Sequence, residues 1–154
     1  VYRQEGETRK IHHLLLAPTF EIVEQINEVL QEHGNLSEDG RPTLDLTSPT
    51  LVETVRDVSD QVEVIPCHIW TPWFSLFGSR SGFDSLDACY RDQSKHIHAY
   101  ETGLSSDPPM NWRVSELDRL TTVSFSDAHS PWPFRIGREA TVLNLEDLSY
   151  DAIL

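Results

Sequence analysis

Residues 62–75 read Val-Glu-Val-Ile-Pro-Cys-His-Ile-Trp-Thr-Pro-Trp-Phe-Ser. The apolar residues at the start predict a short strand over Val62–Ile65, which ends at Pro66 because proline cannot donate to a strand ladder. His68 follows at the carboxyl end of this strand, and a loop rich in aromatic residues comes after it. Long loops at the carboxyl ends of parallel strands are where α/β barrels place their chemistry. The stretch therefore predicts an α/β fold with a functional site at the strand ends.

Strands and helices alternate on both sides of this stretch. Thr19 offers a helix N-cap, and apolar residues at helical spacing after it predict a helix that Gly34 ends. Ser48 as a cap, with Pro49 at the first helical position, predicts a second helix after a loop over 34–47. Further expected elements are a helix over 82–91 and strands over 11–16, 97–101, 121–125 and 141–145. This alternation favours a parallel sheet, in a single domain over residues 1–154.

Composition and charge bound the class of protein. The 154 residues are 38% hydrophobic, which is typical of a globular chain. Two cysteines are too few for a disulfide framework, so we expect a cytoplasmic protein. The longest apolar run, Leu14–Ala17, is too short to cross a membrane, so we expect no membrane partner. Taken as a whole, the net charge of −13 argues against a nucleic-acid partner, because binding to phosphates depends on lysine and arginine. Residues 111–138 nevertheless hold four arginines against three acidic residues and could face an anion. The chain begins at Val1 and its single methionine is Met110, so we expect a piece of a longer protein.

Histidines and carboxylates recur at the expected strand ends. The first strand contains His12 and His13, His68 follows the second, Glu101 ends the third, and Asp127 with His129 follows the fourth. Imidazole nitrogens and carboxylate oxygens are ligands that suit zinc, manganese and related divalent ions. Each residue alone is more often structural, but their recurrence at four strand ends indicates a shared metal site. We expect the remaining histidines His33, His96 and His98 to be structural.

Aromatic residues crowd the loop after His68. Trp70, Trp73, Phe74 and Phe77 stand among turn-forming residues, where their rings could wedge into a duplex or stack on a base. They could also belong to the core, which is the usual place of apolar residues. The residue pattern leaves both interpretations open.

Three long motifs resemble one known family. They are Pro66-Cys-His-Ile-Trp-Thr-Pro-Trp-Phe-Ser-Leu-Phe-Gly-Ser-Arg-Ser-Gly-Phe-Asp-Ser85, Glu101-Thr-Gly-Leu-Ser-Ser-Asp-Pro-Pro-Met-Asn-Trp-Arg113 and Ser126-Asp-Ala-His-Ser-Pro131. With similar residues over nearly the whole chain, they closely resemble the endonuclease Q family of the polymerase-and-histidinol-phosphatase (PHP) superfamily. The long motifs are specific to that family, whereas the single His and Glu residues and the Asp-x-His element are shared by the wider superfamily.

This resemblance implies a fold and an activity. The fold would be part of a distorted (β/α)7 TIM-like PHP barrel with parallel strands, holding divalent metal ions (zinc, magnesium or manganese) at the strand ends. The activity would be metal-dependent hydrolysis of the DNA phosphodiester on the 5′ side of uracil, hypoxanthine or an abasic site. Damaged DNA is then the expected partner, with replication or repair proteins as further partners.

The resemblance also assigns residues by motif. It implies metal ligands that also serve catalysis, namely His68, Glu101, Asp127 and His129. Asp127 would be the bridging or water-orienting carboxylate. His12 matches the family's ligand better than His13, which stays an alternative. Substrate contacts are implied for Trp70, Trp73, Phe74, Phe77, Arg80, Ser105, Asn111, Trp112 and Arg113.

Some elements of the family do not occur in this sequence. The opening His-x-His strand, the acidic ligand before the first strand and the usual zinc-binding segment are missing, so we expect a fragment without the first barrel strands. Two other functions stay open. One is a small-molecule phosphoesterase like the histidinol phosphatases, and the other is a module that binds damaged DNA without cutting it.

Overall fold

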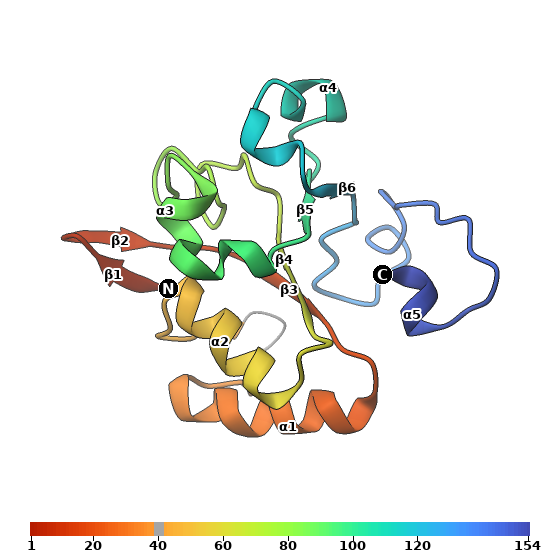
Figure 1. Ribbon diagram of the computed structural model, residues 1–154, viewed down its shortest axis with the longest axis horizontal. Coiled ribbons are helices and arrows are strands. Elements are labelled where there is room, and N and C mark those ends of the chain that lie inside the picture. Colours follow the sequence, from red (N-terminus) through yellow and green to blue (C-terminus); the bar gives the residue numbers. More distant parts are fainter. Residues whose placement is uncertain (39–41) are drawn as a thin grey trace.

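Paired strands run through the middle of the molecule, and an N-terminal hairpin projects from one side of it (Figure 1). The computed structural model describes residues 1–38 and 42–154, so the predicted loop over 34–47 lies partly outside the described residues. Strands β1 (Tyr2–Gln4) and β2 (Glu7–Arg9) form an N-terminal hairpin that the sequence patterns did not predict. The other pairs are β3 (His13–Leu16) with β4 (Glu63–Pro66), and β5 (Ala99–Glu101) with β6 (Thr121–Val123).

Two helices connect β3 to β4, as the sequence predicts. Helix α1 (Phe20–Leu30) begins after Thr19, whose hydroxyl accepts the N–H of Ile22, and a 3-10 turn, η1 (Gln31–His33), continues it to Gly34. Helix α2 spans Ser48–Val58. Its N-cap is Thr47 rather than the predicted Ser48, because the Ser48 hydroxyl is buried and lies 3.0 Å from the Tyr2 hydroxyl.

The expectation of parallel strands holds for one central pair and is wrong for the other. Strands β5 and β6 are parallel, whereas β3 and β4 are antiparallel, with His13 opposite Pro66 and Leu16 opposite Glu63. One crossover helix returns the chain to the end at which a strand began, and this gives a parallel neighbour. Here α1 and α2 run back and forth between the strands (Figure 1), so that the chain enters β4 from the opposite end.

The second half of the chain contains fewer regular elements than predicted. The helix expected over 82–91 is shorter, α3 (Leu86–Tyr90), because it begins only after the cap Ser85, and η2 (Arg91–His96) follows it. No strand forms over 141–145, a stretch that the structure describes. Val142 is 94% exposed there, without a neighbouring strand to pair with. Short helical turns complete the chain: α4 (Pro108–Asn111), η3 (Ser115–Leu117) and α5 (Tyr150–Ile153).

The hydrophobic core lies between α2, α3 and the central strands. Val52 and Val55 of α2 pack with Tyr90 of α3 and with the buried residues of β4 and β5, such as Val64 and Tyr100. The carboxyl ends of β4, β5 and β6 are left at one side of this core, where the long loops begin. Among the residues that the structure describes, no helix has the length and apolar character needed to cross a membrane.

Candidate metal centre

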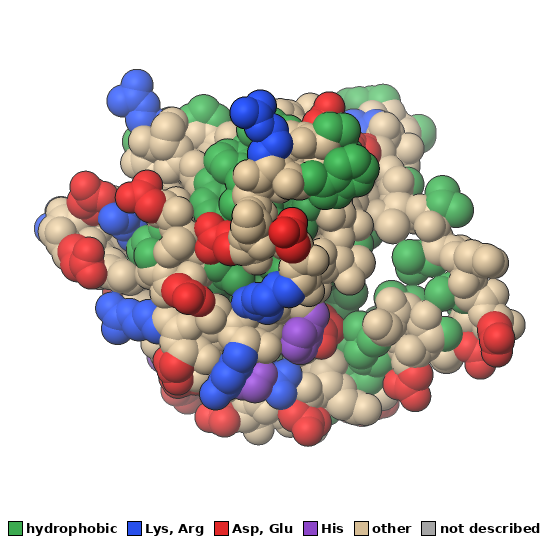
Figure 2. All heavy atoms as spheres, turned by 45° about the horizontal axis from the view of Figure 1, so that its top comes forward, with side chains coloured by type: hydrophobic (Ala, Val, Ile, Leu, Met, Phe, Trp, Pro, Cys, Tyr) green, Lys and Arg blue, Asp and Glu red, His purple; other side chains and the backbone are tan. Residues whose placement is uncertain are grey.

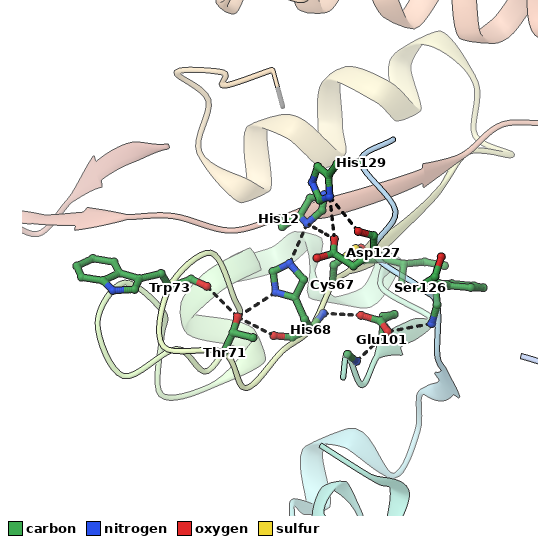
Figure 3. Close-up of polar contacts among 12 residues, drawn as sticks. His12, Cys67, His68, Thr71, Trp73, Glu101, Ser126, Asp127 and His129 are labelled. Atoms are coloured by element: carbon green, nitrogen blue, oxygen red, sulfur yellow. Dashed lines mark hydrogen bonds and ion pairs between the residues drawn. The ribbon is translucent and has the colours of Figure 1, made fainter. Parts of the chain in front are cut away.

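Three side chains from distant parts of the sequence converge on one point (Figure 3). His12 Nδ1 lies 2.9 Å from His68 Nε2 and 3.7 Å from Asp127 Oδ1. One donor atom of each residue lies within 4.8 Å of the other two. We call His12, His68 and Asp127 the donor cluster. Two ring nitrogens and a carboxylate oxygen at such separations can be shared by a single cation.

His129 borders the donor cluster. Its Nδ1 lies 3.6 Å from Asp127 Oδ1 and 2.9 Å from the backbone carbonyl oxygen of Asp127, and its ring centroid is 5.7 Å from that of His12. A carbonyl oxygen can only accept a hydrogen bond, so Nδ1 carries the proton of this contact. In the neutral ring, the lone pair is therefore on Nε2, which can act as a ligand or as a base.

The chain reaches the donor cluster through strained backbone. His68 has φ +32° and Asp127 has φ +48°, both in the left-handed region that ordinary residues avoid. Such conformations persist only where surrounding contacts hold them, and they concentrate at functional sites. One of these contacts joins the Cys67 N–H to the carbonyl oxygen of His12 over 2.9 Å, and thereby ties the ends of β3 and β4 together.

Thr71 holds the ring of His68. Its hydroxyl lies 3.0 Å from His68 Nδ1 and donates its single proton to backbone oxygen, at 2.8 Å to Trp73 O or 3.2 Å to His68 O. His68 Nδ1–H must then be the donor to Thr71, and the lone pair of the ring is on Nε2, which faces His12. A hydrogen bond on the far nitrogen is the usual support of a metal-binding histidine.

Glu101 connects the loops around the donor cluster through hydrogen bonds. The side chain is buried, and its carboxylate accepts three backbone N–H groups: His68 at 2.7 Å, Gly103 at 2.8 Å and Phe125 at 3.0 Å. Three accepted N–H bonds tie together the segments that follow β4, β5 and β6. The predicted role of Glu101 as a metal ligand stays a prediction, because its oxygens do not belong to the close group of donor atoms in the described residues.

His13 and Cys67 do not belong to the close group of donor atoms. His13 packs edge-on against Tyr90, with ring centroids 5.8 Å apart, and burial lowers the pKa of His13 to about 3. The Cys67 thiol lies 3.7 Å from Ile65 O, and burial, followed by the negative charges of Glu101 and Asp127, raises its pKa to about 12. The structure therefore places His12 rather than His13 among the donor atoms.

The donor cluster opens into a cavity of about 790 Å³. His129, Trp73, Phe74 and Ser105 line it beside the cluster, and apolar residues of α1 such as Ile26 line the far side. This volume is within the range of pockets that enclose a small ligand or a single nucleotide.

The structure divides the predicted substrate residues into three groups. Trp70, Phe77 and Asn111 are structural: the two rings pack 4.7 Å apart against the core, and the indole N–H donates to buried Asn111 over 2.7 Å. Trp73, Phe74 and Ser105 line the cavity. Arg80, Trp112 and Arg113 are exposed at the surface.

The sequence reasoning missed two residues that shape the site. A Cβ atom at Gly103 would lie 2.5 Å from His68 Cβ, so this glycine lets two loops approach closely. Thr71 was missed as the support of His68. Its position three residues after a histidine at a strand end, before a proline, was the available signal.

Comparisons with known proteins find similar sequences and similar structures for this chain. No protein-family model matches the chain. It is 40% identical over 77 residues to the uncharacterized protein MJ0043 of Methanocaldococcus jannaschii, covering 50% of this chain and 9% of that protein. It is 32% identical over 145 residues to the uncharacterized protein YqxK of Bacillus subtilis, covering 91% and 34%.

Two crystal structures have the same fold with a TM-score of 0.82. One is the lesion-specific endonuclease PfuEndoQ from Pyrococcus furiosus, at 31% identity over 98% of this chain and 39% of that one. The other is endonuclease Q in complex with a 27-mer duplex substrate that has an abasic lesion at the active site, at 33% identity over 94% and 35%. The chain thus spans less than two fifths of the length of these relatives. By fold and by sequence identity over nearly its whole length, the chain is identified as endonuclease Q-like, and it corresponds to a part of that protein.

Proposed function

We propose that this chain carries the metal centre of a DNA repair endonuclease that hydrolyses the phosphodiester on the 5′ side of uracil, hypoxanthine or an abasic site. The observation that carries this proposal is the convergence of His12, His68 and Asp127 on the wall of a nucleotide-sized cavity. The relationship to a lesion-specific endonuclease supports the choice of damaged DNA as the substrate.

The residues present fit a divalent ion. Two imidazole nitrogens and one carboxylate oxygen form the donor cluster, and the Thr71 hydroxyl supports the outer nitrogen of His68. Zinc, manganese and magnesium all accept ligands from such a set, although zinc and manganese suit the imidazoles better. His12, His68 and Asp127 would hold the ion, with His129 and Glu101 as further ligands. Such an ion activates water and offsets the charge of a phosphate group.

The side chains around the ion would have separate roles in the reaction. The Asp127 carboxylate would orient the attacking water, because its Oδ1 faces both His12 and His129. The single lone pair of His129 Nε2 would serve one of two roles, either as a ligand of the ion or as the base that takes up a proton from this water. A damaged nucleotide pairs poorly, costs less to extrude from the duplex, and would enter the cavity beside Trp73 and Phe74.

The wider fold is part of the same proposal. We infer that the parallel pair of β5 and β6, with functional residues after their carboxyl ends, belongs to a distorted (β/α)7 barrel of PHP type. The antiparallel pair of β3 and β4 would then be a local departure from the barrel pattern.

Cleavage of lesion-bearing duplexes tests the proposal. The full-length natural protein is incubated with manganese or magnesium and a duplex that carries one uracil, hypoxanthine or abasic site. We expect a nick on the 5′ side of the lesion, lost in Asp127→Ala and retained in the control His98→Ala, whose ring pairs with Glu63. An intact duplex, or equal activity of Asp127→Ala, would refute the proposal. Hydrolysis of phosphate monoesters without nicking would favour the small-molecule phosphoesterase.

A further inference from the structure

A lysine and two exposed aromatic rings meet at the rim of the cavity. Lys10 Nζ lies 5.1 Å from the ring centroid of Trp73 and 5.1 Å from that of Phe74. Trp73 is 50% exposed and Phe74 is 44% exposed, although both are large apolar side chains. Within the described part of the chain, no carboxylate lies within ion-pair distance of Lys10.

Hydrogen bonds connect the segment that contains Lys10 to the loop that contains Phe74. The Lys10 N–H donates to Ser81 O over 3.1 Å, and the Ser81 hydroxyl donates to Lys10 O over 3.4 Å while it accepts the Phe74 N–H over 3.2 Å. The His12 N–H donates to Phe74 O over 3.1 Å. Ser81 is only 2% exposed, and Phe74 has a strained φ of +59°. These bonds therefore fix the backbone of Lys10 and Phe74, from which the ammonium group and the Phe74 ring project.

The rim is joined directly to the donor cluster. Lys10 precedes His12 by two residues, and Trp73 and Phe74 line the cavity that contains the cluster. The Thr71 hydroxyl connects Trp73 O to the ring of His68 (Figure 3). A group bound at the rim would thus lie next to the position of the cleaved bond.

The charge of the molecule makes a local cation important. The chain has a net charge of −13, with 12 lysine and arginine residues against 25 acidic ones. On the face shown in Figure 2, basic side chains are scattered among acidic ones rather than gathered into a broad patch. A DNA strand is therefore repelled overall, and its binding must depend on a few cations placed next to other attractive groups.

We propose that Lys10, Trp73 and Phe74 form a binding site for one nucleotide of an unpaired DNA strand, next to the metal centre. The rings stack on the base, and the ammonium group contacts the adjacent phosphate. This assignment rests on the proposed function for the choice of DNA. It separates Trp73 and Phe74, as binding residues, from Trp70 and Phe77, which pack against the core.

The test uses binding without cleavage. The chain is freed of metal with EDTA, and its affinity for a fluorescent oligothymidylate of about 16 nucleotides is measured by anisotropy at several salt concentrations. Lys10→Gln is compared with Lys95→Gln, which removes the same charge from an exposed site on η2. We expect Lys10→Gln to reduce the slope of log K against log salt by about 0.7, and Lys95→Gln to leave it unchanged.

A second pair of variants tests the stacking. Trp73→Ala should weaken binding by about tenfold. Trp132→Ala, which removes another exposed indole from the C-terminal segment, should leave binding unchanged. Trp73→Phe should restore most of the affinity because it keeps a ring. Circular dichroism confirms that each variant is folded.

The outcomes separate this inference from the proposed function. Equal salt slopes for the two lysine variants, equal affinities for the two tryptophan variants, or no oligonucleotide binding by the unmodified chain would overturn the rim site. Binding that depends on Lys10 and Trp73, together with no nicking by the full-length protein, would refute the endonuclease alone. Nicking with unchanged binding in Lys10→Gln and Trp73→Ala would refute the rim site alone.

Discussion

Replacing Gly103 by alanine should displace His68. Gly103 has φ +66°, and an added Cβ would lie 2.5 Å from His68 Cβ and 2.8 Å from His68 Cα. Neither atom is the far end of a flexible side chain, so the loop that carries His68 must move. The positive φ costs about 1 kcal/mol in any residue with a Cβ. The overlap adds roughly 2 kcal/mol, as in overpacked cores.

Gly137 offers a matched control. It has φ +69°, and an added Cβ meets nothing within 4 Å. Gly137→Ala therefore carries the backbone cost alone. We expect it to lower the free energy of unfolding by about 1 kcal/mol, and Gly103→Ala by about 3 kcal/mol, in urea titrations followed by tryptophan fluorescence.

Metal affinity provides the second readout for these two variants. Displacement of His68 should weaken the binding of manganese or zinc by about 10- to 100-fold in Gly103→Ala, as for other changes next to metal ligands. Gly137→Ala should bind the ion as the unmodified chain does. Equal unfolding energies and equal metal affinities for the two variants would show that the close approach of Gly103 does not position His68.

Three further predictions concern the surroundings of the donor cluster. Thr71→Val should weaken metal binding about tenfold, whereas Thr71→Ser should retain it, because only serine keeps the hydroxyl beside His68. Equal metal affinities of the two variants in titration calorimetry would contradict this prediction. Glu101→Gln should lower the free energy of unfolding by about 2 kcal/mol, since an amide cannot accept all three N–H bonds; an unchanged urea midpoint argues against it. Burial raises the pKa of Cys67 and of Cys89 to about 12, so neither thiol should react with a disulfide reagent at pH 8 until the chain unfolds, and prompt labelling of the native chain would disprove this.

Local signals in the sequence predicted much of the first half of the fold. The cap at Thr19 and the helical spacing after it gave α1, and Pro49 located the start of α2. These features depend on residues within one or two helical turns of each other, and such residues are adjacent or nearly adjacent in the sequence. The antiparallel pairing of β3 with β4 was not predicted, because it depends on how the two connecting helices turn.

The C-terminal segment shows the limit of a local pattern. Thr141 and the apolar residues after it have strand propensity, but no strand lies beside them among the described residues. Thr141 contacts Ser124 through its side chain instead. Figure 2 shows apolar side chains of this segment standing apart from the body of the molecule, in agreement with the 93% exposure of Leu148.

The sequence predicted the residues that provide the donor atoms of the candidate site, but it did not predict the residues that position them. His68 and Asp127 were found because each follows a short strand, and the carboxyl ends of neighbouring strands lie close together. The sequence could not separate Trp70, in the core, from Trp73, at the cavity, since both lie in one loop and differ only in what packs against them. The contact of Gly103 with His68 depends on the tertiary fold alone.

Direct measurement of bound metal tests the central claim that His12, His68 and Asp127 share a divalent ion. The chain, Asp127→Asn and the control Asp57→Asn, which removes an exposed carboxylate of α2, are dialysed against zinc or manganese and analysed for metal content. The account predicts bound metal in the unmodified chain and in Asp57→Asn, and its loss in Asp127→Asn. Equal metal content in all three proteins, or none in any of them, would contradict it.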